Sequence, residues 1–174
     1  MEIPCKKAVA RAFLACVTIR RLRRPLEVHM TNDEIRSFLE RFRNAWETQN
    51  VNELVGCYAD DCVVVSPIFN TLNHRSQVEK SYNDFFKALA IQKIKVEDIV
   101  IGNDDPPRAV IVWNLQVTHV GEMFGMPATG KKIERTSAFI LTLRDGLITK
   151  EFRIYDFTSM LIQLGALRAK PARN

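Results

Sequence analysis

The fold is decided by residues 117–167, which read VTHVGEMFGMPATGKKIERTSAFILTLRDGLITKEFRIYDFTSMLIQLGAL. A β-rich run ends at His119, and a loop with three glycines and a proline follows before the next run begins. Asp145-Gly146 then separates that run from one that reaches Tyr155, and an Asp-Gly pair between two β-rich runs is typical of a hairpin. The stretch ends in apolar residues that predict a short closing helix. Two long antiparallel strands are therefore the predicted centre of the fold.

Upstream of this stretch the sequence predicts helices first and strands afterwards. Thr31 with Glu34 three residues later is a capping-box pattern, and apolar residues then recur at helical spacing as far as Trp46. The further predicted elements are helices at 51–58 and 76–89 and strands at 62–65, 94–101 and 108–119. This order predicts an α+β fold in which the N-terminal helices pack on a curved, mostly antiparallel sheet. The open end of such a cone is the predicted ligand site.

The charge of the chain is concentrated at its N-terminus. The 174 residues are 47% hydrophobic and 26% charged, which is typical of one soluble globular domain. Residues 1–29 hold seven Lys or Arg and two Glu, so they carry the whole net charge of +5, and residues 30–174 are neutral. A neutral domain does not favour nucleic-acid binding, and we expect no nucleic-acid partner.

The predicted domain covers residues 30–168, with a basic extension before it at 1–29 and a tail after it at 169–174. The apolar run of the extension is twelve residues long and holds Arg11, so it is too short to span a bilayer as a helix. We expect a disordered extension or a true start at Met30; an Arg-rich organelle presequence or a membrane-surface helix is the alternative. Membrane association of the domain is not expected.

No cofactor motif is present in the sequence. The four cysteines form no CxxC pair, and no histidine lies at ligand spacing from any of them, so we expect no bound metal. The sequence also has no glycine-rich phosphate loop and no dinucleotide fingerprint. We therefore expect a protein that works without a cofactor, and the reduced cysteines fit a cytoplasmic location.

Several segments together resemble a known family. They are Tyr58–Pro67 (YADDCVVVSP), Thr118–Gly121 (THVG), Gly125–Gly130 (GMPATG), Asp145–Ile148 (DGLI) and Gln163–Gly165 (QLG). With the order of elements, they resemble the NTF2-like superfamily and, within it, the SnoaL-like polyketide cyclase branch. The resemblance covers about residues 31–167. It implies a cone-shaped domain that takes a small apolar metabolite and forms a homodimer through the exposed face of its sheet.

The acid and base positions of these relatives are not occupied by acids or bases in this chain. In SnoaL-like cyclases an aspartate on the last strand does proton transfer, and the resemblance places Arg153 there. An assisting histidine on the preceding strand corresponds to Phe139. The base of ketosteroid isomerases corresponds to Ser66, and their oxyanion-hole tyrosine corresponds to Phe42. Arginine stays protonated and phenylalanine has no proton to give, so neither known chemistry transfers directly.

A different set of polar residues supplies the candidate site. Strand alternation puts Arg135 and Ser137 on the face of Phe139, and Glu151 and Tyr155 on the face of Arg153. Arg153 can stabilise developing negative charge, with a base among Glu151, Asp156 and His119. The alternative is that Arg153 forms a structural ion pair at a sheet edge and that His119 anchors the glycine loop. The candidate substrate-binding residues are Phe42, Trp46, Ser66, Phe69, Trp113, Arg135, Ser137, Phe139 and Tyr155.

Three functions fit this pattern. The first is a cofactor-free cyclase, isomerase or dehydratase that acts on an apolar carbonyl compound in the cone. The second is a protein that binds a hydrophobic metabolite without converting it, which the loss of the family's acid and base positions favours. The third is an adaptor like the nuclear transport factor that names the superfamily. The sequence favours the enzyme slightly.

Overall fold

The computed structural model describes residues 30–102 and 104–168, which form an α+β domain with one six-stranded sheet. The expectations for 1–29 and 169–174 lie outside the described residues. In chain order the elements are α1 (Asn32–Glu47), α2 (Val51–Val55), β1 (Tyr58–Ser66), β2 (Asn70–Asn73), α3 (Arg75–Ala88), β3 (Leu89–Gly102), β4 (Arg108–His119), β5 (Lys132–Arg144), β6 (Leu147–Tyr155) and α4 (Phe157–Leu164).

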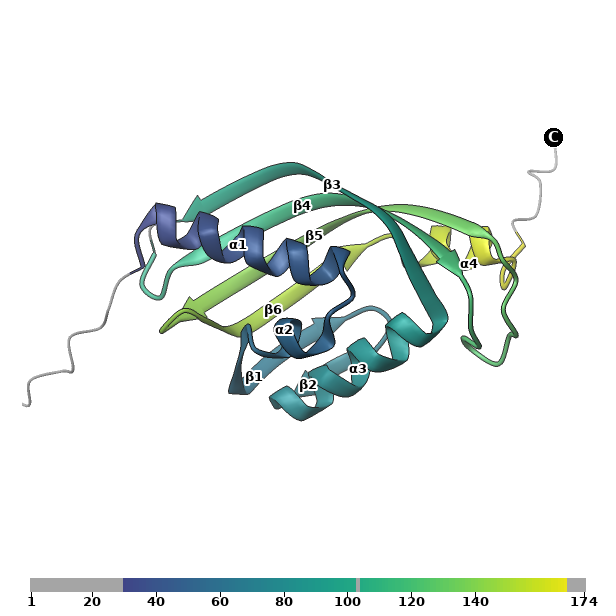
Figure 1. Ribbon diagram of the computed structural model, residues 1–174, viewed down its shortest axis with the longest axis horizontal. Coiled ribbons are helices and arrows are strands. Elements are labelled where there is room, and N and C mark those ends of the chain that lie inside the picture. Colours follow the sequence, from purple (N-terminus) through teal and green to yellow (C-terminus); the bar gives the residue numbers. More distant parts are fainter. Residues whose placement is uncertain (1–29, 103, 169–174) are drawn as a thin grey trace, which may run out of the picture.

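The strands are arranged in the order β2-β1-β6-β5-β4-β3, and only β1 and β6 pair in parallel. The long strands β3 to β6 curve together, as Figure 1 shows. The predicted hairpin between β5 and β6 is confirmed, since Asp145 and Gly146 take φ angles of 53° and 74°, the positive values that a type I′ turn needs. The predicted α+β class with a curved, mostly antiparallel sheet is also confirmed.

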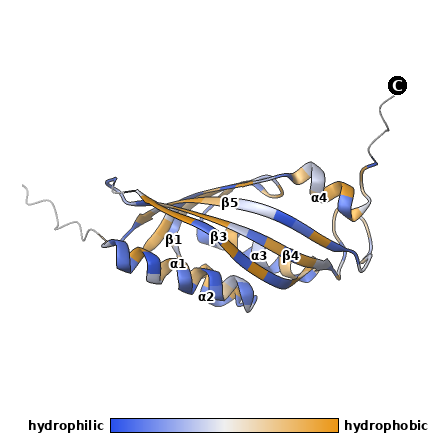
Figure 2. Ribbon diagram, turned by 90° about the horizontal axis from the view of Figure 1, so that it is seen from above, coloured by the Kyte–Doolittle hydropathy of each residue, from blue (hydrophilic) through white to orange (hydrophobic). Residues whose placement is uncertain are grey.

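Helices α1, α2 and α3 lie on one side of the sheet (Figures 1 and 2). The predicted capping box starts α1: the Thr31 side chain accepts from the Glu34 N–H, and Glu34 accepts from the Thr31 N–H. The inward residues of α1 and α3 pack aromatic rings over β4 and β5. Trp46 contacts Tyr82, Phe85 and Trp113 with ring centroids 5.2–5.6 Å apart. This aromatic cluster packs on the inner face of the sheet under α1.

Three local predictions need correction. The second helix was expected over 51–58, but it ends at Val55, and Tyr58 is instead the first residue of β1. The strand predicted at 62–65 begins earlier, so Asp60 and Asp61 lie in β1 at its irregularity, where they pair with surface arginines. The short strand β2 was not predicted. A strand that begins at Tyr58 matters for function, because it brings that phenol to the inner face of the sheet.

The other face of the sheet has no helix of the described chain across its centre. Along β4 and β5 the residues alternate between buried and half-exposed, as expected for a sheet covered on one side only. The apolar side chains that are half-exposed or exposed on this outer face are Val63, Val65, Val110, Val112, Ala138, Ile140, Phe152 and Ile154. Among the described residues, no helix is both long and apolar enough to cross a bilayer.

Candidate functional site

The inner face of the sheet carries the polar residues that alternation predicted there. Arg135 and Ser137 on β5 and Glu151 and Arg153 on β6 are all more than nine-tenths buried, and Tyr155 is half-buried. Because β6 lies between β1 and β5, these groups are in the middle of the sheet and not at its edge, which corrects the expected position of the Arg153 ion pair. The buried face divides into two groups of residues with different hydrogen bonding.

The first group is a closed network around Glu151. Its carboxylate accepts from Arg153 Nε at 2.7 Å and from the Tyr58 hydroxyl at 2.5 Å. The Tyr58 oxygen in turn accepts from the Tyr82 hydroxyl at 2.6 Å, and Arg153 Nη2 donates to Tyr82 at 2.9 Å. Both carboxylate oxygens of Glu151 therefore have protein partners, as do Nε and Nη2 of Arg153, whose guanidinium also lies over the Tyr82 and Phe139 rings.

The network holds its protons firmly. Burial raises the pKa of the Tyr58 phenol well above its usual value, and the adjacent Glu151 carboxylate raises it further. The pKa of Tyr82 is also raised, chiefly by burial. Burial lowers the pKa of Arg153, but Glu151, Tyr82 and Tyr58 together outweigh this effect, so the pKa is raised overall. These groups keep one charge state across the neutral range, so the network acts as a fixed ion pair with two neutral phenols.

The second group is a ring of side chains beside this network, which we call the donor ring. Trp113 and Ser137 are cross-strand partners, and so are Ser137 and Tyr155. The Arg135 guanidinium stacks on Tyr155, 4.0 Å from the ring centroid, and lies 5.6 Å from that of Phe85. Trp46 closes the ring, because its centroid is 5.6 Å from both Phe85 and Trp113. The donor ring is thus Trp46, Phe85, Trp113, Arg135, Ser137 and Tyr155.

Four buried polar atoms of the donor ring have no hydrogen-bond partner within the described residues. Among the described residues, Trp46 Nε1, Trp113 Nε1, Arg135 Nη1 and Ser137 Oγ are buried and make no hydrogen bond. A buried polar group without a partner costs about 1–3 kcal/mol, so four of them in one ring favour a site where ordered water or a ligand supplies the partners. The indoles and the guanidinium can only donate, and the hydroxyl can do so. The missing partner is therefore rich in hydrogen-bond acceptors.

His119 lies further along the inner face of β4. It does anchor the glycine loop, since its Nδ1 accepts from the Thr129 N–H at 3.2 Å and its main chain pairs with Gly130 and Lys131. That bond places the proton of a neutral imidazole on Nε2, which is buried and has no partner within the described chain. Leu115 on β4 pairs with Arg135 on β5. His119 follows four residues after Leu115, which is about 13 Å further along β4.

The remaining candidates lie outside the donor ring. The Asp156 side chain is the N-cap of α4 and accepts from the Ser159 N–H at 2.8 Å, in an exposed position. Phe42 is fully buried between Phe38 and Trp113. The Ser66 hydroxyl is 3.5 Å from that of Tyr155, so it borders the ring.

A hollow of about 170 Å³ opens next to Phe85 on α3. Phe69, the last of the predicted substrate-binding residues, lines it together with Asp84, Ala88 and residues 122–124 of the glycine loop. None of the six donor-ring residues lines this hollow, so it is separate from the donor ring. The loop is held there because the Val120 and Gly121 N–H groups both donate to the Ala88 carbonyl.

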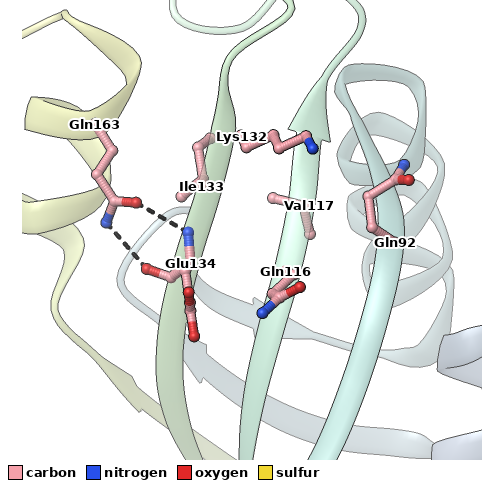
Figure 3. Close-up of a pocket in the computed structure, with 7 residues that line it drawn as sticks. All are labelled: Gln92, Gln116, Val117, Lys132, Ile133, Glu134 and Gln163. Atoms are coloured by element: carbon pink, nitrogen blue, oxygen red, sulfur yellow. Dashed lines mark hydrogen bonds between the residues drawn. The ribbon is translucent and has the colours of Figure 1, made fainter.

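A second hollow, of about 360 Å³, lies on the outer face and is distinct from the cone (Figure 3). Its floor includes Gln116 and Lys132, which alternate with the inward residues Val117 and Ile133. At its side, the Gln163 amide of α4 pairs with both main-chain groups of Glu134, as Figure 3 shows. This side chain completes the edge of β5 where β6 has ended.

Sequence reasoning missed three residues of the site: Tyr58, Tyr82 and Phe85. All three appear as apolar positions in a helical pattern, and Tyr58 was assigned to the wrong element. One signal was available, because a buried tyrosine needs a hydrogen-bond partner and an inward glutamate needs donors. The pattern does not say which tyrosine meets Glu151, since Tyr58 and Glu151 are 93 residues apart.

Comparison with known proteins agrees with this architecture. The sequence model of the SnoaL-like polyketide cyclase family matches residues 36–164, which is most of the chain. The chain belongs to this family. The suspected resemblance is thereby confirmed, and it places the chain among proteins of the cyclase and isomerase type. No match is found among curated proteins.

Solved structures of SnoaL-like proteins share the fold at low sequence identity. TsrD from Streptomyces laurentii is 19% identical with a TM-score of 0.68, over 80% of this chain and 100% of its own. AclR from Streptomyces galilaeus, provisionally described as a hydroxylase, is 21% identical with a TM-score of 0.68, over 81% and 91%. A protein of Silicibacter sp. TM1040, provisionally described as a polyketide cyclase, is 18% identical with a TM-score of 0.66, over 81% and 100%.

Proposed function

We propose that this protein is a cofactor-free enzyme of the cyclase or isomerase type that acts on a small compound with several carbonyl groups, bound in the cone. The observation that carries the proposal is the donor ring, whose four unpartnered polar atoms can all donate hydrogen bonds. Carbonyl oxygens are acceptors without protons of their own and match such a set. The family description supports the same class of ligand.

Electrostatic stabilisation of an enolate is the chemistry that suits these residues. When a proton next to a carbonyl passes to a solvent water, negative charge is left on the carbonyl oxygen, and fixed donors favour that charge. Arg135, Ser137 and Trp113 are the donors in this proposal, while Tyr155 and Phe85 are apolar walls. His119 presents its Nε2 atom further along β4, so a ligand that reaches both sites is elongated. Arg153 supports the floor of the site through Glu151 and contributes no proton transfer.

This proposal is tested by following exchange of carbonyl-adjacent protons. A panel of aryl 1,3-diketones is incubated in D2O with the protein, and loss of the proton signal is measured by NMR. We expect accelerated exchange for at least one compound, and a rate reduced roughly a hundredfold in Ser137→Ala or Trp113→Phe, as for loss of an oxyanion donor. Gln116→Ala, on the outer face of β4, is the matched control and should keep the wild-type rate. No acceleration across the panel would contradict the proposal.

A second candidate function is binding of a carbonyl compound without conversion. The observation that favours it is the saturated state of Glu151, whose carboxylate already accepts from Arg153 and Tyr58 and has no free role as a base. In the same NMR experiment, line broadening of the diketone without proton exchange would identify this function. It uses the same donor ring, so the two candidates differ only in whether the bound compound changes.

We also propose that the apolar outer face of the sheet pairs two copies of the chain. Ile154 on β6 is 56% exposed in the middle of that face, and burial of such a patch is the usual driving force for a dimer. Light scattering at micromolar concentration should give twice the subunit mass, and Ile154→Arg should give a monomer. Ile162→Arg, at an exposed apolar position on α4, is the control and should remain dimeric. A monomeric wild type would refute the dimer.

A further inference from the structure

The buried interior of the domain holds one more positive charge than negative charge. In the described chain, the buried side chains that carry a full charge are Arg135, Glu151 and Arg153. Glu151 is already committed to Arg153, with their atoms 2.7 Å apart. Arg135 makes no ion pair within the described residues, although it is only 8% exposed. A guanidinium keeps its proton in proteins, so its charge is present whether or not a partner is there.

The acidic residues nearest in sequence to Arg135 and to Phe85 do not compensate the positive charge of Arg135. Glu134 is the preceding residue on β5, but alternation turns it to the outer face, where it lines the hollow of Figure 3. Asp84 is next to Phe85 on α3, but it is exposed and lines the other hollow. Burial lowers the pKa of Arg135, the Tyr155 hydroxyl offsets part of this, and the positive charge of Arg153 lowers the pKa further. An unpaired buried charge of this kind is costly, which makes a bound anion favourable.

We infer that the donor ring binds the carboxylate of a planar, carbonyl-bearing acid, with Arg135 as its counter-ion. This deepens the proposed function and rests on it, since it assigns the ligand a charge and a polar end. One excess positive charge matches one carboxylate, whereas a phosphate monoester would bring about −1.5 to −2. The Arg135 fork and the Ser137 hydroxyl are positioned on the same strand face to share the two carboxylate oxygens. The aromatic walls of Tyr155, Phe85 and Trp113 suit a flat conjugated body behind that group.

The test compares two probes that differ only in charge, anthraquinone-2-carboxylate and anthraquinone-2-carboxamide. The chain has two tryptophans, Trp46 and Trp113, and both belong to the donor ring, so quenching of their fluorescence reports occupancy. For the full chain at neutral pH we expect the acid to bind roughly ten- to hundredfold more tightly than the amide, as for a hydrogen bond to a charged group.

Variants then assign the preference to Arg135. Arg135→Gln should bind acid and amide with similar affinity, and Arg135→Lys, which keeps the charge, should retain part of the preference. Lys132→Gln removes a cation from the outer face of the same strand and should keep the full preference. Thermal melting of each variant shows whether it is folded, and Arg135→Met is the second neutral variant if the glutamine does not fold.

The outcomes separate this inference from the proposed function. Equal binding of acid and amide to the wild type, or a preference that survives in Arg135→Gln, would overturn the carboxylate site and leave the carbonyl-binding function standing. Failure of both quinones to quench the tryptophans would count against the donor ring as a ligand site and overturn both. Loss of the preference in Lys132→Gln would show that general surface charge causes it, which also overturns the inference.

Discussion

Arg153→Met is expected to lower the free energy of unfolding by about 3–5 kcal/mol, the usual cost of leaving one partner of a buried ion pair alone. The Glu151 carboxylate is fully buried and accepts two of its hydrogen bonds from Arg153. In the variant only the Tyr58 hydroxyl remains as a donor to it. Urea unfolding at neutral pH measures the loss, with the midpoint and the slope compared with those of the wild type.

Two further variants make this prediction specific. Arg153→Met with Glu151→Leu removes both charges and should recover much of the lost stability, because no buried charge is left without a partner. Arg43→Met breaks the half-exposed pair with Glu47 on α1 and should cost less than about 1 kcal/mol. A loss in Arg153→Met no larger than in Arg43→Met would show that the network is not a structural element of the fold.

The fold could be predicted from the sequence where local patterns decide it. The bounds of β4 match the prediction of 108–119, and the Asp145-Gly146 turn is where the dipeptide placed it. The inward faces of β5 and β6 followed from alternation once the resemblance had placed Phe139 and Arg153 toward the cone, because the side-chain period of a strand is two. The early part of the chain was less predictable, since Tyr58 continues an apolar helical pattern and becomes a strand residue only through pairing with β6.

The site was predicted residue by residue but not as a set of interactions. Alternation identified Arg135 and Arg153 as inward residues and treated Arg153 as the active one. It could not show that Glu151 satisfies Arg153 and leaves Arg135 unpaired, because that choice depends on Tyr58 and Tyr82 arriving from distant elements. Tertiary packing therefore decides which of the two arginines is free to bind a ligand.

The stability of the domain is expected to fall steeply as the pH rises above about 9–10, because buried groups hold their protons more tightly in the folded chain than in the unfolded one. Burial raises the pKa values of Tyr58 and Tyr82, and it raises that of Cys62 to about 11. The unfolded chain loses these protons first. The contribution of these groups to the stability of the fold is therefore complete below their unfolded pKa values, and it is lost as the pH rises toward their folded pKa values. Each proton retained only by the folded state contributes about 1.4 kcal/mol per pH unit.

Tyr82→Phe tests this dependence, because it removes one of the titrating groups. Its stability at neutral pH should be lower, since Tyr82 accepts from Arg153 and donates to Tyr58. Between about pH 10 and 11 the free energy of unfolding of Tyr82→Phe should nevertheless fall less steeply than that of the wild type, by about 1.4 kcal/mol per pH unit. Phe86→Leu, whose ring stacks on Tyr82 at 6.0 Å, is the matched control without a titrating group. Phe86→Leu should be destabilised by the same amount at every pH. Urea unfolding measures the stability of each variant, and phenolate absorbance measures the ionisation of its tyrosines. An unchanged slope in Tyr82→Phe would mean that this phenol ionises as easily in the folded chain as in the unfolded one, and that the network is open to water.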